Sequence, residues 1–227
     1  AARTMMDHPT AAWENDKFLD CIKAVRNQEL YYKAISFYVE IHPEGLRKLL
    51  KVLEASLDHA RVVHQMRKAD QLPLATPYLR DVQKENIKAV NEAVNEILVE
   101  EEDFEGLRIS IDDYDNFDQI EFAQTLEKHE LLEFRRIASL VLRRMKRFAQ
   151  SVALSKRDKM YKDAIDTAAE SEDGALVEEL LKFFVFEAGD KECFTATLFT
   201  CYDLVKPDVV LELGWRNGLT DYAMPYL

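Results

Sequence analysis

Apolar residues recur along the chain at helical spacing, one stripe after another. One such stripe consists of leucines at i, i+3, i+4, i+7 and i+11: Leu46, Leu49, Leu50, Leu53 and Leu57. Charged residues occupy the opposite face of that segment, so it is amphipathic at the period of a helix. Similar stripes follow within 87–98, 131–145 and 194–205, and alternating β-branched runs longer than about four residues are lacking. The pattern predicts helices and no sheet.

The stripes fall in pairs, and turn-forming residues separate them. Gly189-Asp190 is one separator: glycine can end a helix in the left-handed conformation, and Asp190 can cap the next helix. We expect helical hairpins over these ranges: 15–42, 44–70, 74–102, 104–128, 131–156, 159–188 and 190–217. Because a two-helix unit cannot bury its stripe alone, neighbouring hairpins must stack. The sequence therefore predicts an all-α fold, an α-solenoid that forms a single continuous, elongated rod over residues 1–227.

Composition supports this fold and excludes other classes. Glycine and proline supply six residues each, too few for the closely spaced turns of a β-sandwich or barrel. The net charge of −12 repels phosphate backbones and anionic lipids, so we expect no nucleic-acid partner. The longest apolar runs have about five residues, against roughly 18 for a membrane span, so we expect no direct membrane insertion.

The cysteines and the first residue indicate the compartment and the extent of the chain. Cys21, Cys193 and Cys201 are an odd number at wide spacing, which is typical of reduced thiols in a cytoplasmic protein. The chain begins at Ala1 instead of a methionine, and no signal peptide is visible. We therefore expect a piece of a longer cytoplasmic chain.

An acidic cluster at Asp112–Asp118 is the first candidate for chemistry. A calcium loop that started at Asp113 would need an oxygen ligand at its fifth position and glycine at its sixth, where Phe117 and Asp118 stand. A magnesium-dependent synthase could use Asp112 and Asp113 with Asp163 on a facing helix, and this alternative stays open. A turn with helix caps is the simpler interpretation, and we expect no metal site.

Other possible catalytic motifs are incomplete. His129 begins a stretch that differs in one position from a zinc-protease helix, but Glu133 stands where the second imidazole is required. We expect His129 to form a hydrogen bond at a helix corner, and Cys193 and Cys201 to be small apolar residues. We also expect the following aromatic residues between hairpins: Trp13, Trp215, Tyr31, Tyr32, Phe183 and Phe184. With no phosphate loop, no catalytic residues and no cofactor expected, the chain is predicted to be a scaffold and not an enzyme.

Several longer stretches are more specific than composition. They are HPTAAW at His8, ELYYKAISFY at Glu29, VNEAVNEILVEEEDF at Val90, DDYDNFDQI at Asp112, EKHELLEFRRIA at Glu127, MYKDA at Met160 and LFTCYDLVKPDVVLE at Leu198. Together they resemble the clathrin heavy chain family, in the leg segment nearest the triskelion hub, known as the proximal leg. The resemblance extends from Ala1 to Leu227.

The resemblance implies a structural coat protein. Legs of this family are α-solenoids; three heavy chains join through a C-terminal region absent here to form a homotrimer, and legs pack together in the cage. The implied location is the cytoplasmic face of coated pits and coated vesicles, where the family serves endocytosis and intracellular transport. Clathrin light chains bind along the proximal leg, and Trp13, Lys17 and Lys88 match residue types that the family has there.

This sequence also departs from the family pattern. Glu14 stands where relatives often have a basic residue, the turn at Arg144–Lys146 lacks the usual glycine, and Phe148 replaces a tryptophan. Another helical-repeat adaptor, such as a sorting-complex subunit, is the alternative function.

Overall fold

A computed structural model describes residues 2–7 and 13–226 of the chain. The described residues form helices, turns and loops and contain no strand. They divide into two compact units, Ala1–Asp118 and Gln119–Leu227. Residues 8–12, which include most of the HPTAAW stretch, lie outside the described residues.

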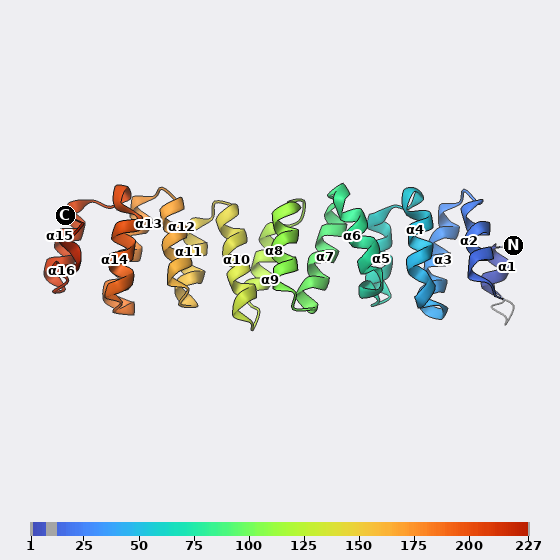
Figure 1. Cartoon of the computed structure of the whole chain (residues 1–227), viewed down its shortest axis with the longest axis horizontal. Helices are drawn as coiled ribbons and strands as arrows, with labels where there is room; N and C mark the ends of the chain where they lie inside the picture. Colours follow the sequence, from blue (N-terminus) through green and yellow to red (C-terminus); the bar gives the residue numbers. More distant parts are fainter. Residues whose placement is uncertain (1, 8–12, 227) are drawn as a thin grey trace. The chain divides into compact units, whose positions relative to one another are not determined.

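The first unit is a row of helices that stand side by side (Figure 1). Its α-helices are α1 (Ala2–Asp7), α2 (Asn15–Lys23), α3 (Gln28–Ile41), α4 (Leu46–Leu53), α5 (His59–Lys68), α6 (Thr76–Val82), α7 (Lys88–Glu100) and α8 (Phe104–Asp113). Short 3-10 turns join several of them: η1 (Pro43–Gly45), η2 (Glu54–Ser56), η3 (Leu72–Ala75) and η4 (Gln83–Glu85).

The apolar stripes of these helices make the core of the first unit. In α4, the four leucines at i, i+3, i+4 and i+7 are buried, and the charged residues between them are exposed. The helix α4 packs against α2, α3 and α6, so its stripe is covered by helices from both neighbouring hairpins. Truncating one such leucine to alanine costs about 2–5 kcal/mol in proteins generally. Stacking therefore supplies the stability that a lone hairpin lacks.

The second unit has the same construction (Figure 1). Its α-helices are α9 (Gln119–Glu127), α10 (Leu132–Arg144), α11 (Phe148–Arg157), α12 (Tyr161–Glu170), α13 (Gly174–Phe183), α14 (Lys191–Thr200), α15 (Pro207–Arg216) and α16 (Thr220–Ala223). Two shorter segments complete it, the π-helix η5 (Phe184–Ala188) and the 3-10 turn η6 (Tyr202–Leu204). One apolar cluster runs from α11 to the end of the unit and includes Phe184, Phe194 and Leu198, all fully buried.

The structure confirms the all-α class and the helical hairpins. Each predicted range contains two helices with a turn between them; the range 74–102, for example, holds α6 and α7. The helices of the range 104–128 fall in different units, because α8 ends the first and α9 begins the second. The short helices α1 and α16 lie outside the predicted ranges. The continuity of one rod over residues 1–227 stays a prediction.

Buried polar side chains and ion pairs connect successive hairpins. The Gln83 side chain donates to Ser110 Oγ at 2.8 Å, and Ser110 in turn donates to Asn95 Oδ1 at 2.7 Å, all three being buried. Ion pairs join helices one repeat apart: Glu29–Arg61, Arg67–Glu96, Glu127–Arg157, Arg136–Asp163, Arg143–Glu170 and Lys156–Glu179. Since a buried donor without its acceptor is costly, the polar network restricts how neighbouring hairpins can pack.

The turns at helix ends use the left-handed conformation, mostly without glycine. Gly189 has φ 64° and Asp190 caps α14 by accepting a hydrogen bond from the Cys193 amide at 2.9 Å, as predicted. Positive φ also occurs at non-glycine residues: Asp70, Asn86, Glu102, Lys146, Lys159 and Glu172. At Lys146 the next amide, that of Arg147, donates to the Leu142 carbonyl at 2.9 Å, which closes the C-terminus of α10. A side chain costs energy in this conformation.

We expect Lys146→Gly to raise the free energy of unfolding by about 0.5–1 kcal/mol, because glycine relieves the strain of φ 58°. Urea denaturation followed by circular dichroism measures the change. The matched control is Lys162→Gly on the exposed face of α12, which should lower stability by about 1 kcal/mol. A Lys146→Gly variant less stable than the original chain would contradict the assignment of strain to this turn.

Candidate partner-binding surfaces

Trp13 lies just before α2 and belongs to an aromatic cluster. Its ring centroid is 4.9 Å from that of Phe18 and 5.1 Å from that of Phe37. It also stacks on the imidazole of His42 at 5.4 Å, with 11° between the ring planes. Trp13 is half-buried, so one part of the indole packs between the hairpin helices and another part remains accessible. Trp13 was expected between hairpins, but its ring contacts lie with residues of the single hairpin 15–42, between α2 and α3. Contact with a partner is untested.

Tyr38 completes the same cluster from α3. It is fully buried, and its hydroxyl donates a hydrogen bond to Asn15 Oδ1. Burial, with a smaller contribution from Asp16, raises the pKa of Tyr38 to about 12. The phenol therefore stays protonated and holds the start of α2 against α3.

Lys17 and Lys88 lie at separate places in the first unit. Lys17 projects from α2 with 71% of its side chain exposed, and its ammonium lies 2.8 Å from a Glu14 carboxylate oxygen. Lys88 begins α7 and lies 3.7 Å from Glu92. Lys17 lies in the first turn of α2, four residues after Trp13, whereas Lys88 begins α7, several helices further along the row (Figure 1). A partner that contacted all three would have to extend along the unit.

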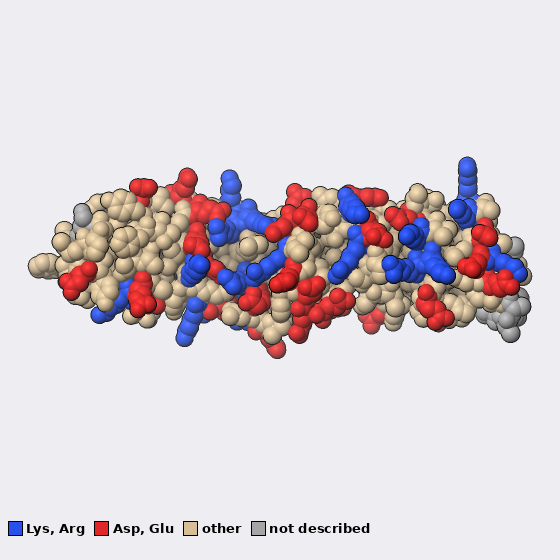
Figure 2. All heavy atoms as spheres, viewed as in Figure 1, with Lys and Arg blue, Asp and Glu red and all other residues tan. Residues whose placement is uncertain are grey.

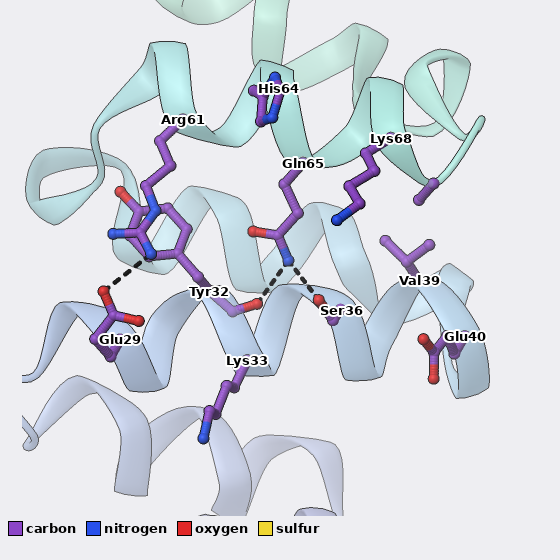
Figure 3. Close-up of a pocket in the computed structure, with 11 residues that line it drawn as sticks. Glu29, Tyr32, Lys33, Ser36, Val39, Glu40, Arg61, His64, Gln65 and Lys68 are labelled. Carbon is purple, nitrogen blue, oxygen red and sulfur yellow. Dashed lines mark hydrogen bonds and ion pairs between the residues drawn. The ribbon is translucent and has the colours of Figure 1, made fainter.

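A groove between α3 and α5 was not anticipated from the sequence. Its volume is about 510 Å³, and Figure 3 shows side chains of both helices facing one another across it. Arg61 lies over the Tyr32 ring at 3.9 Å and pairs with Glu29 at 2.9 Å. Gln65 donates to the Tyr32 carbonyl at 2.7 Å and to Ser36 Oγ at 2.5 Å. Opposite charges about one repeat apart in sequence are the signal that could have indicated these contacts.

The acidic segment that starts at Asp112 ends a helix and continues as a loop: Asp112 and Asp113 belong to the last turn of α8, and residues 114–118 connect α8 to α9. Asn116 donates to the Asn86 carbonyl at 2.8 Å, and Asn91 donates to the Asn116 carbonyl at 3.0 Å. Asp163, the residue offered for a magnesium-dependent synthase, is bound by Arg136 at 2.6 and 3.1 Å. The carboxylate that the synthase alternative requires is therefore engaged by a guanidinium.

His129 and the cysteines have local structural contacts. His129 Nδ1 accepts a hydrogen bond from the Leu131 amide at 3.1 Å, which confirms the predicted corner. All three cysteines are free thiols, as predicted. Burial raises the pKa of both Cys193 and Cys201 to about 11, with Asp190 adding to the shift at Cys193. Both thiols are therefore protonated, and so poor nucleophiles, at neutral pH.

Surface charge is unevenly distributed. On the drawn face, acidic and basic side chains are interspersed over much of the chain and become sparse over the C-terminal helices of the second unit (Figure 2). Several large apolar side chains of the segment from η5 to the residue after α16 are exposed to solvent: Phe186, Phe199, Leu211, Trp215 and Met224. Trp215 is 78% exposed. The prediction that it lies between hairpins is wrong, because it points outward from α15 while Leu213 and Val210 face the core.

The described part of the chain offers neither a cluster of metal ligands nor a membrane-spanning helix. Within residues 2–7 and 13–226, no group of three or more His, Cys, Asp and Glu side chains could hold a metal ion. In the same ranges, no helix is both long and apolar enough to cross a bilayer.

Comparison with known proteins identifies the family. A family model described as a region in clathrin and VPS matches residues 50–192, more than half of the chain. The chain belongs to the clathrin family. Clathrin heavy chain 1 of Oryza sativa subsp. japonica is 55% identical over 227 residues, and clathrin heavy chain 2 of Homo sapiens is 55% identical over 226 residues. The clathrin heavy chain of Dictyostelium discoideum is 51% identical over 227 residues.

These clathrin heavy chains are much longer than this chain. The alignments cover 100% of this chain but only 13% of the rice protein and 14% of the human protein. The similarity to clathrin thus concerns one segment of each relative. It extends through both units, because the aligned residues include the whole of Ala1–Asp118 and Gln119–Leu227.

We expect Trp13→Ala to lower the free energy of unfolding by about 2 kcal/mol, because it removes a half-buried ring from the aromatic cluster. Lys17→Ala is the matched control: its exposed ion pair should contribute no more than about 0.5 kcal/mol. Thermal and urea denaturation measure both changes. Equal stability of the Trp13→Ala variant and the original chain would show that the indole is a surface residue only.

Proposed function

We propose that this chain is a leg segment of a clathrin heavy chain, a structural component of the coat on vesicles and coated pits. The observation that carries the proposal is the similarity to clathrin heavy chains at about 55% identity through both units. Stacked helical hairpins suit this role, because repeated packing of neighbours produces long surfaces along which other proteins can bind. The role places the chain on the cytoplasmic side of the membrane and assigns it no enzymatic activity.

In this proposal the first unit binds a helix of a clathrin light chain. Trp13 offers a half-exposed aromatic surface, and the exposed ammonium of Lys17 lies on the first turn of α2 that follows it. Lys88 offers a second cation further along the row. A helix that lay across the unit could place an apolar residue on Trp13 and acidic residues near both lysines. Other heavy-chain legs are the second class of partner.

A sorting-complex subunit is the remaining candidate, because the matching family model covers both clathrin and VPS regions. The relatives that align with all of this chain favour the coat protein, since they carry the name clathrin heavy chain.

Titration with a fluorescent peptide of the clathrin light-chain helix tests the proposal. We expect saturable binding that weakens about three- to tenfold in Lys17→Glu and in Lys88→Glu, because each reversal places an acid beside an acidic partner. Fluorescence anisotropy at two salt concentrations measures the affinity. The matched control is Lys162→Glu on α12 of the second unit, which should leave the affinity unchanged.

The absence of binding at about millimolar peptide would contradict light-chain recognition by this segment. Binding that all three lysine reversals leave unchanged would retain the partner and exclude Lys17 and Lys88 from the interface.

A further inference from the structure

One asparagine of this chain is followed directly by glycine: Asn217, the residue at which α15 ends. Asn217 and Gly218 are both exposed to solvent. Gly218 has φ 66°, and a Cβ atom added to it would meet nothing within 4 Å. Its amide forms no hydrogen bond with any residue that the structure describes. The peptide between Asn217 and Gly218 is therefore open to water and to chemical attack.

An asparagine that precedes glycine can react with the backbone of its own chain. Hydroxide removes the proton of the Gly218 amide, and the nitrogen then attacks Cγ of Asn217. The new N–Cγ bond closes a five-membered succinimide, the Cγ–Nδ2 bond breaks, and Nδ2 leaves as ammonia with a proton from water. Water then opens the ring at either carbonyl, which gives aspartate or isoaspartate. Because glycine has no side chain to obstruct the attack, the reaction needs only water.

Two hydrogen bonds hold this turn in an unreactive conformation. The Asn217 side chain donates through Nδ2 to the Leu213 carbonyl at 2.8 Å. The Leu219 amide donates to the Gly214 carbonyl, also at 2.8 Å. At ψ 9° the Gly218 nitrogen eclipses the backbone nitrogen of Asn217, whereas ring closure requires it to eclipse Cβ. The peptide has to rotate before it can react, and the rotation breaks both hydrogen bonds.

The other asparagines are protected or have a bulkier neighbour. Asn91 and Asn95 are buried. Asn86 and Asn116 are joined by a hydrogen bond from the Asn116 side chain to the Asn86 carbonyl at 2.8 Å. Asn27 is exposed, but it caps α3 and is followed by glutamine. Asn27 is therefore an internal reference for an accessible asparagine without the glycine.

We propose that Asn217 is a site of spontaneous deamidation, whose rate is set by opening of the turn between α15 and α16. The proposal is independent of the coat function, since it requires only the chemistry and contacts of this turn. Because ammonia is lost, the change accumulates with the age of the chain and does not reverse by itself.

The product weakens the attachment of α16. A carboxylate at position 217 cannot donate to the Leu213 carbonyl, and its negative charge lies at the C-terminus of α15, where the helix dipole disfavours it. The helix α16 packs against α14 and α15, and Leu219, Ala223 and Tyr226 are the buried residues of this segment. Deamidation therefore loosens the packing of α16 against the rest of the second unit.

Ageing of the original chain at physiological pH and temperature, with and without urea, tests the reaction. Mass spectrometry of proteolytic peptides measures the loss of ammonia, and an isoaspartyl methyltransferase with labelled methyl donor counts isoaspartate. Since each hydrogen bond changes an opening equilibrium by about two- to twelvefold, the native chain should react at Asn217 about 4- to 150-fold more slowly than the chain in urea. Asn27 should remain intact over the same period.

A native rate at Asn217 no higher than that at Asn27 would overturn the proposed site. A native rate more than about a thousandfold below the rate in urea would overturn control by these two hydrogen bonds alone.

Two leucine variants test whether opening of the turn sets the rate. Leu219→Ala removes a buried side chain that anchors the turn, so native deamidation should accelerate at least about tenfold, up to the rate in urea. Leu211→Ala is the matched control, because Leu211 is exposed on α15, and its rate should equal that of the original chain. Circular dichroism verifies that both variants are folded. Equal native rates in the two variants would contradict control by the turn.

A pair of aspartate variants tests the structural consequence. In Asn217→Asp, the amides of α16 should exchange hydrogen about two- to twelvefold faster than in the original chain, because the bond to the Leu213 carbonyl is lost. Asn27→Asp adds the same charge at the N-terminus of α3, where aspartate caps as well as asparagine, and exchange in α3 should not change. Unchanged exchange in α16 of Asn217→Asp would show that deamidation leaves the packing of α16 intact.

Discussion

The structure depends on the burial of an apolar stripe on each helix against the helices of the next hairpin. A single hairpin leaves part of its stripe exposed, as α4 would without α2 and α6 beside it. In the second unit, one cluster of buried residues extends from Val152 in α11 to Tyr226 after α16. Stability in such an array is approximately a sum of contributions from neighbours. Because the core uses only one side of each helix, the opposite, solvent-exposed sides of the helices are available for contacts with partners.

Polar groups determine how neighbouring hairpins align. The buried Gln83, Ser110 and Asn95 form a connected network, and hydrogen bonds of this kind allow few alternative alignments. The ion pairs between helices one repeat apart are more exposed and contribute less individually. They also use many of the cations of the chain, such as Arg61, Arg67 and Arg157. The same charge pattern thus helps to align each hairpin with the next.

Local patterns in the sequence account for most of the fold and for little of the candidate surfaces. The period of the leucines in α4 and the Gly189-Asp190 pair predict helix faces and ends because those features depend on nearby residues. The burial of Trp215 was predicted wrongly because the residue type alone does not show which side of α15 packs against neighbouring helices. The groove at Arg61 and Gln65 depends on how α3 and α5 meet, which no single segment specifies. Trp13 was expected between hairpins, yet it packs inside one hairpin against Phe37 and His42, which only the three-dimensional arrangement of α2 and α3 shows.

Native-state hydrogen exchange of a Leu180→Ala variant tests the central claim most directly. Leu180 is fully buried in α13, which packs against α12 and α14. If stability comes from contacts between neighbours, amide protection should fall by about 2–5 kcal/mol in α12, α13 and α14. Protection in α3 to α7 of the first unit should not change. An equal loss of protection in every helix, or a loss confined to α13, would contradict the account.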